Sequence, residues 1–123
     1  MNIDSTLEPQ QYYLHIGIHQ IDISGGDAAA LYYASKTLSQ LIDFALTEQT
    51  TLPCLKIYDA PNFVRRGYML DISRNKVPKM ATLYKLVDML ADWKINEFQL
   101  YVEHTFAYKN HRDAWQGCSP MTP

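Results

Sequence analysis

Residues 65–74 have the sequence Arg-Arg-Gly-Tyr-Met-Leu-Asp-Ile-Ser-Arg, and this stretch decides the fold. Its centre is a nearly continuous apolar run, which is typical of a parallel strand covered on both faces. Asp71, Ser73 and Arg74 place a carboxylate, a hydroxyl and a guanidinium at the carboxyl end of that strand. Because ligands of parallel α/β folds bind at this end, the stretch predicts a fold class and the position of a site.

A helix and a second strand follow the loop that begins at Asn75. Pro78 favours the first turn of a helix, since its missing amide hydrogen would be unpaired there anyway. Apolar residues repeat on one face of residues 80–90, and Asn96 suits a left-handed helix end. Residues 97–102 alternate in polarity and predict the second strand. A strand, a helix and a strand over roughly thirty-five residues predict a right-handed parallel crossover.

The chain before this unit predicts a smaller structure. We expect residues 1–11 to be an unpatterned lead-in. Residues 12–18 alternate with period two, as in a half-buried strand, and a turn near residues 19–20 returns the chain through residues 21–23. The pattern therefore predicts a β-hairpin.

Asp27 is a suitable N-cap for an amphipathic helix that continues to about Leu46 and whose apolar face includes Leu38 and Ile42. A short strand around residues 55–57 follows, and the turn-rich residues 59–62 mark the expected domain boundary. Two successive α/β structures are therefore predicted within one short chain.

The composition narrows the classes of partner. With 123 residues and 14.2 kDa, the chain is large enough to bury a core. A net charge of −2 and a pI near 6.0 give no electrostatic reason to expect binding to nucleic acid or to an anionic membrane. The sequence has no apolar run long enough for a membrane span. Residues 1–5 lack the pattern of a signal peptide, so we expect a cytoplasmic protein if Met1 is the native start.

Polar residues follow both predicted parallel strands. Arg74 comes after the first, and Glu103 and His104 come after the second, so these groups are expected on one face. A guanidinium suits vicinal hydroxyls or a carboxylate, and a carboxylate beside an imidazole suits sugar hydroxyls or proton transfer. The alternative is that Arg74 pairs with Asp71 or another acid only to hold the loop.

No metal or cofactor is predicted. His15 and His19 lie on one side of the expected strand but lack an acidic ligand pattern, so we interpret them as surface histidines. Gly25-Gly26 before a helix is too weak a signal for phosphate binding. Of the two cysteines, we expect one to be a buried free thiol and the other a loop thiol.

Several segments together resemble one enzyme family. Residues 66–74, a proline and a helix that ends at residues 93–96 resemble the start of the catalytic barrel of glycoside hydrolase family 20, the β-N-acetylhexosaminidases. The family's pattern there is Arg-Gly-x-x-x-Asp-x-Ser-Arg. Residues 12–24 and 30–41 resemble the hairpin and helix of the smaller domain before that barrel, and residues 57–61 resemble the junction.

The resemblance implies a fold and an activity. Residues 1–61 would be part of a small α+β domain, and residues 62–123 the first strand-helix-strand and loop of a truncated (β/α)8 barrel. Such a barrel needs about 250 residues, so most of it would lie beyond this chain. Family members remove terminal N-acetylhexosamine from glycans with retention, and the acetamido oxygen of the substrate is the nucleophile. The catalytic Asp-Glu pair would lie beyond Pro123, so this chain alone is expected to be inactive.

By resemblance, Arg74 takes the place of the arginine that binds hydroxyls of the terminal sugar. The position of Asp71 suggests that it supports Arg74 or is simply a strand-end residue satisfied by backbone amides. Many members carry a His-x-His run that ends in two aspartates, whereas residues 99–104 are Gln-Leu-Tyr-Val-Glu-His. This departure indicates a different glycan preference and makes Glu103 and His104 the candidate sugar contacts.

Two alternatives remain at the level of sequence. One is a complete, non-catalytic module that holds glycan or protein through its tyrosine-rich surface and the loop at residues 106–108. The other is a neighbouring glycosidase family with a similar leading domain, which the Asp-x-Ser-Arg run disfavours. If the barrel is truncated, its unpaired strand edges and apolar helix faces predict self-association.

Overall fold

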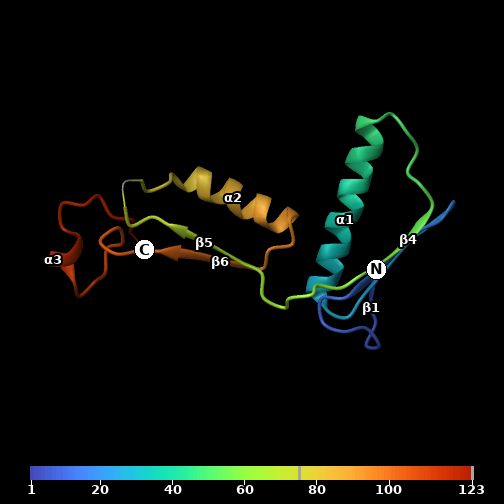
Figure 1. The fold of residues 1–123 in the computed structure, drawn as a ribbon, viewed down its shortest axis with the longest axis horizontal. Helices are drawn as coiled ribbons and strands as arrows, with labels where there is room; N and C mark the ends of the chain where they lie inside the picture. Colours follow the sequence, from blue (N-terminus) through green and yellow to red (C-terminus); the bar gives the residue numbers. More distant parts are fainter. Residues whose placement is uncertain (75, 123) are drawn as a thin grey trace. The chain divides into compact units, whose positions relative to one another are not determined.

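A computed structural model describes residues 1–74 and 76–122. Within it the chain forms two compact units, Met1–Val64 and Arg65–Pro123 (Figure 1). Asn75, in the predicted loop, and Pro123, the last residue of the predicted barrel segment, lie outside the described residues.

The first unit contains a four-stranded sheet in the order β1-β3-β2-β4. Its strands are β1 (Asn2–Ile3), β2 (Tyr12–Ile16), β3 (Ile21–Gly25) and β4 (Leu55–Asp59). Strand β2 is antiparallel to both β3 and β4, while β1 is parallel to β3. The amide of Gly17 donates to the carbonyl of Gln20 at 2.9 Å and closes the turn. The predicted hairpin is confirmed.

Helix α1 (Ala28–Thr47) provides the other half of the core. The Asp27 carboxylate accepts a hydrogen bond from the amide of Ala30 at 2.7 Å, so the predicted N-cap is confirmed. Ala30 and Ala34 are completely buried, and their small side chains let the helix approach the sheet closely. They pack with the inward residues of β2, each of which is at most 2% exposed: Tyr12, Leu14 and Ile16.

Packing explains the pair of glycines before this helix. A Cβ added at Gly25 would lie 2.8 Å from the Cβ of Ala30, and one at Gly26 would collide with the carbonyl oxygen of Glu8. The glycines therefore permit close contact of the helix start with neighbouring chain segments.

The structure corrects three predictions for this unit. Residues 1–11 are not an unpatterned lead-in, because β1 pairs with β3 in a register that sequence periodicity cannot show. Ile18 does not continue the strand; it lies in the hairpin turn and is 84% exposed. The predicted helix face included Ile42, which is exposed, whereas Tyr33 is buried.

The second unit contains a parallel pair of strands, β5 (Gly67–Asp71) and β6 (Glu97–Tyr101), joined through helix α2 (Met80–Asp92). The register pairs Gly67 with Glu97 at one end and Asp71 with Tyr101 at the other. The predicted parallel strand-helix-strand is confirmed. Helix α3 (Arg112–Trp115) is a single short turn within the following segment.

The prediction that β5 is covered on both faces is wrong for this chain. Met69 is 60% exposed, and Tyr101 on the adjacent strand is 44% exposed. Tyr68 and Phe98 are register partners whose rings stack with centroids 6.2 Å apart. Phe98 lines a small pocket with Leu90, so this face of the strand pair lies toward α2. Helix α2 lies on one face of this two-stranded sheet, and the exposure of Met69 and Tyr101 shows that the described residues of this unit leave the opposite face largely open.

The ends of α2 also differ from the prediction. Pro78 precedes the helix instead of lying in its first turn, and the N-cap is Lys79, whose side chain makes no capping hydrogen bond. The left-handed residue is Lys94, with φ of 58°, and not Asn96. The amide of Ile95 then donates to the carbonyl of Leu90 at 2.9 Å, as in a Schellman motif. The Asn96 side chain instead accepts a hydrogen bond from the amide of Arg66 at 2.8 Å.

Candidate functional site

The candidate site lies where β5 and β6 end side by side. Because the register pairs Asp71 with Tyr101, the residues that follow the two strands are close in space. Arg74 Nη2 lies 3.8 Å from Glu103 Oε1, and the two side chains are 72% and 39% exposed. The pair presents hydrogen-bond donors beside acceptors and remains accessible to solvent. That is the combination needed to bind vicinal hydroxyl groups.

Tyr101 is a third member of this cluster that sequence reasoning missed. Its hydroxyl donates a hydrogen bond to Glu103 Oε1 at 3.1 Å. This hydrogen bond and the charge of Glu103 raise the pKa of Tyr101. The signal for it in the sequence was the two-residue spacing between Tyr101 and Glu103, which places side chains on the same side of an extended chain.

Asp71 shapes the turn after β5. Its Oδ1 accepts hydrogen bonds from the amide and the hydroxyl of Ser73, at 2.8 and 2.5 Å. These bonds, the hydroxyl first, hold the pKa of Asp71 below its ordinary value of 3.8, and the charge of Arg74 acts in the same direction. Ser73 is completely buried, so its hydroxyl has its partner inside the protein. Asp71 therefore supports the turn that leads to Arg74, and the ion pair of Arg74 is with Glu103.

His104 is partly buried and follows Glu103 directly. None of the contacts that join Arg74, Glu103 and Tyr101 involves His104. The structure thus brings Arg74 and Glu103 together and leaves the predicted role of His104 to the sequence alone.

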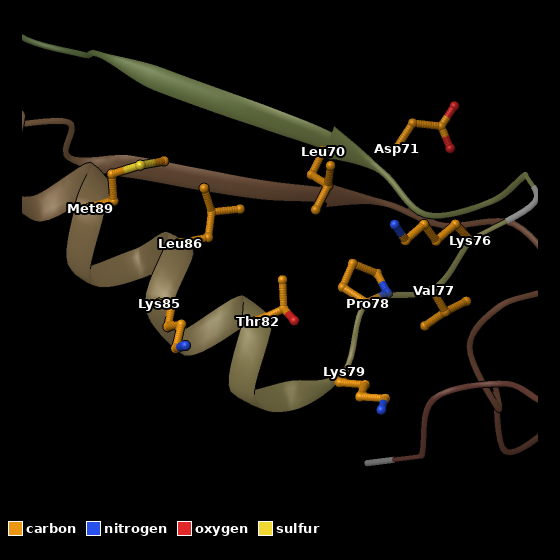
Figure 2. Close-up of a pocket in the computed structure, with 10 residues that line it drawn as sticks. All are labelled: Leu70, Asp71, Lys76, Val77, Pro78, Lys79, Thr82, Lys85, Leu86 and Met89. Atoms are coloured by element: carbon orange, nitrogen blue, oxygen red, sulfur yellow. The ribbon is translucent and has the colours of Figure 1, made fainter.

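A groove of about 720 Å³ lies in the same unit, between β5 and α2. Figure 2 shows Leu70 directed toward α2, whereas the carboxylate of Asp71 extends on the other side of the strand. Leu86 and Met89 form the apolar wall on the helix, and three lysines lie around it: Lys76, Lys79 and Lys85. Arg74 and Glu103 do not line this groove, so the polar cluster and the groove are separate features.

The two histidines considered as metal ligands, His15 and His19, lie in or beside the hairpin. His15 Nδ1 lies 3.3 Å from Asp22 Oδ2 across the hairpin, while His19 lies in the turn, not on the strand. Among the described residues, no group of three or more His, Cys, Asp or Glu side chains could hold a metal ion.

Cys54 and Cys118 are both free and exposed, so the prediction of one buried thiol is wrong. No helix within the described ranges is long and apolar enough to cross a membrane.

Comparison with known proteins shows which enzyme family the chain is similar to. Residues 1–60 match the family model "Glycosyl hydrolase family 20, domain 2". Over 97 residues the chain is 34% identical to a β-hexosaminidase of Akkermansia muciniphila, an overlap that covers 79% of this chain and 20% of that protein. The first part of the chain therefore matches domain 2 of glycosyl hydrolase family 20, and a β-hexosaminidase matches most of its length.

Further similar proteins are enzymes of the same kind. An N,N'-diacetylchitobiase of Vibrio harveyi is 36% identical over 74% of this chain and 10% of its own length. The crystal structure of a β-N-acetylhexosaminidase matches 92% of this chain and 25% of its own chain, with a TM-score of 0.83 and 28% identity. The Vibrio harveyi exo-β-N-acetylglucosaminidase bound to N-acetylglucosamine matches 80% of this chain and 16% of its own, with a TM-score of 0.69 and 29% identity. The chain spans between a tenth and a fifth of the length of these curated relatives.

Proposed function

We propose that the full-length protein containing this chain is an exo-β-N-acetylhexosaminidase that removes terminal N-acetylhexosamine from glycans. Residues 62–123 would form the first strand-helix-strand of its (β/α)8 barrel, and the catalytic Asp-Glu pair would follow Pro123. The acetamido oxygen of the substrate would attack the anomeric carbon, as the family's retaining mechanism implies. This chain would supply contacts to the sugar and no catalytic residue.

The observation that carries this proposal is the Arg74–Glu103 pair at the carboxyl ends of two adjacent parallel strands. In barrel enzymes, residues at these strand ends are the ones that contact substrate. The match of one solved β-N-acetylhexosaminidase to 92% of the chain extends well past residue 60 and supports the barrel assignment.

In this site Arg74 would donate hydrogen bonds to hydroxyls of the terminal sugar, and Glu103 would accept from them. The exposure of both side chains in this chain fits a pocket whose remaining walls come from later strands. His104 is proposed as a further sugar contact, and Asp71 as the support of the turn that presents Arg74.

A direct assay tests the function. The full-length protein should release nitrophenol from nitrophenyl N-acetyl-β-glucosaminide, and residues 1–123 alone should not. Nitrophenyl β-glucoside is the matched control, since it lacks the acetamido group that the mechanism needs as nucleophile. Equal turnover of the two substrates, or no turnover by the full-length protein, would overturn the proposal. Measurable hydrolysis by the 123-residue chain would refute its assigned role as a non-catalytic part.

A further inference from the structure

Among the described residues, the Glu103 carboxylate makes two contacts, and both use the same oxygen. The Tyr101 hydroxyl donates to Oε1 at 3.1 Å, and Arg74 Nη2 lies 3.8 Å from that same Oε1. Neither contact involves Oε2. A carboxylate oxygen can accept more than one hydrogen, so Oε2 keeps its full capacity to accept from a substrate hydroxyl.

The two contacts differ in kind. At 3.8 Å the guanidinium is too far from Oε1 for a hydrogen bond and provides charge attraction without fixing a geometry. The Tyr101 hydroxyl is within hydrogen-bond distance, and its backbone is held by strand pairing, since Tyr101 is the last residue of β6 and pairs with Asp71. Tyr101 is therefore the group able to restrict the rotamers of Glu103.

We propose that Tyr101 is a positioning residue that orients the Glu103 carboxylate toward a sugar hydroxyl beside Arg74. The inference rests on the proposed function, since it assigns Glu103 a substrate to recognise. A partly exposed glutamate otherwise samples several rotamers and loses that freedom when the sugar binds. With Tyr101 in place, part of this ordering is complete before binding, so the acceptor is preorganised.

The protonation state of Tyr101 also favours its hydrogen bond to Glu103. The hydrogen bond to Glu103 and its charge raise the pKa of Tyr101 above its ordinary value of 10.0. The phenol therefore remains a donor throughout the neutral range, in which a carboxylate is an acceptor only. The contact thus has a fixed direction, from the hydroxyl of Tyr101 to the oxygen of Glu103.

Steady-state kinetics of the full-length protein test the role in recognition. Tyr101→Phe should lower kcat/KM about fivefold, mostly through a higher KM, because it removes one hydrogen bond to a charged group that orders the site. Tyr68→Phe is the matched control: Tyr68 lies on the adjacent strand with a similar exposure of 42%, and its face of the pair is the one toward α2. It should leave the kinetics unchanged.

Substrates that lack one hydroxyl group test whether Tyr101 positions Glu103 or only stabilises the end of β6. Replacing the recognised hydroxyl of the substrate should cost the wild type more than it costs Tyr101→Phe, since the variant already holds Glu103 poorly. A structural role would instead scale the rates of all substrates equally. Equal losses in both proteins, or equal effects of Tyr101→Phe and Tyr68→Phe, would overturn the proposal.

A titration that needs no activity tests the contact by itself. In the full-length protein with ¹³Cζ-labelled tyrosine, the Tyr101 signal, assigned through Tyr101→Phe, should titrate above pH 10.0. Glu103→Gln should lower that pKa, with circular dichroism recorded to show that the fold persists. An unchanged pKa in Glu103→Gln would refute the contact. A full-length protein without hydrolase activity would overturn the proposed function, while this titration would still decide whether Tyr101 and Glu103 interact.

Discussion

The two units of the chain bury their apolar residues to very different extents. In Met1–Val64, helix α1 covers one face of a four-stranded sheet, and the inward residues of β2 are almost fully enclosed. In Arg65–Pro123, one helix lies beside a two-stranded sheet, and Met69 in the middle of β5 remains 60% exposed. The sequence of β5 is that of a strand buried on both faces, yet the described residues cover only one.

The difference lies in how much of each sheet is covered by its helix. A half-covered antiparallel sheet is a stable end state, because its outer face is polar. A two-stranded parallel sheet is not, because parallel sheets are found with both faces covered. The first unit therefore encloses a core between its helix and its sheet, while the second unit leaves apolar surface of its strand pair exposed.

Separating the two units should produce the largest effect. We expect residues 1–64 alone to unfold in one cooperative transition, since their core lies within the unit. Residues 65–123 alone should lack such a transition and should self-associate through the open β5–β6 pair. Calorimetry measures the first property, and light scattering measures the second.

The reverse result would break the contrast between the units. A monodisperse 65–123 segment with a sharp thermal transition would show that its core is complete without further chain. Failure of residues 1–64 to fold would show that the first unit depends on the second.

Matched leucine substitutions should show the same contrast at the level of single residues. Leu14→Ala in β2 removes a completely buried side chain and should lower the free energy of unfolding by about 3 kcal/mol. Leu70→Ala in β5, at the edge of the groove, should change this free energy by less than about 1 kcal/mol in the 123-residue chain, because the cooperative transition is that of the first unit. Chemical denaturation measures both values. Equal costs in this chain would contradict the view that the second unit is open.

Local patterns predicted the elements well and their environment poorly. The alternation of residues 12–16 and the Asp27 cap are properties of adjacent residues, so the hairpin and α1 follow from the sequence. Strand β1 has two residues and exists through its pairing with β3, which no local periodicity records. The exposure of Met69 depends on what covers the strand, and a strand's own sequence cannot supply that.

The candidate site shows the same division. Arg74 and Glu103 could be predicted because parallel strands align their carboxyl ends. The contribution of Tyr101 required the contact itself, since tyrosines are frequent in this chain and most of them lie elsewhere. The left-handed position fell on Lys94 instead of Asn96 because the last turn of α2 ends earlier than residue preference alone indicates.

Substitutions at the N-caps of the two long helices should change stability by smaller amounts and in opposite directions. Asp27→Ala removes the hydrogen bond to the Ala30 amide and should destabilise the first unit by about 1 kcal/mol. Lys79→Ser adds a capping hydroxyl where the Lys79 side chain makes no capping hydrogen bond and should stabilise helix α2 by about 0.5 kcal/mol. Thermal unfolding followed by circular dichroism measures both changes. A loss of stability in Lys79→Ser would indicate that Lys79 makes a contribution other than capping.

The amino ends of β5 and β6 carry a second Arg–Glu pair that serves as a control for the proposed site at their carboxyl ends. An Arg–Glu pair lies at each end of β5 and β6: Arg65 Nε is 3.3 Å from Glu97 Oε2 at the amino ends, and Arg74 is paired with Glu103 at the carboxyl ends. Both arginines are strongly exposed. Only the carboxyl-end pair is placed where a barrel binds its substrate.

The most direct measurement is therefore kcat/KM of the full-length protein with each arginine replaced by alanine. Arg74→Ala should lower kcat/KM on nitrophenyl N-acetyl-β-glucosaminide by roughly a hundredfold, because sugar hydroxyls lose charged donors in a closed pocket. Arg65→Ala should change it less than twofold, since exposed ion pairs contribute little. Equal effects of the two substitutions, or an unchanged kcat/KM in Arg74→Ala, would contradict the assignment of the sugar-binding site to the carboxyl ends of β5 and β6.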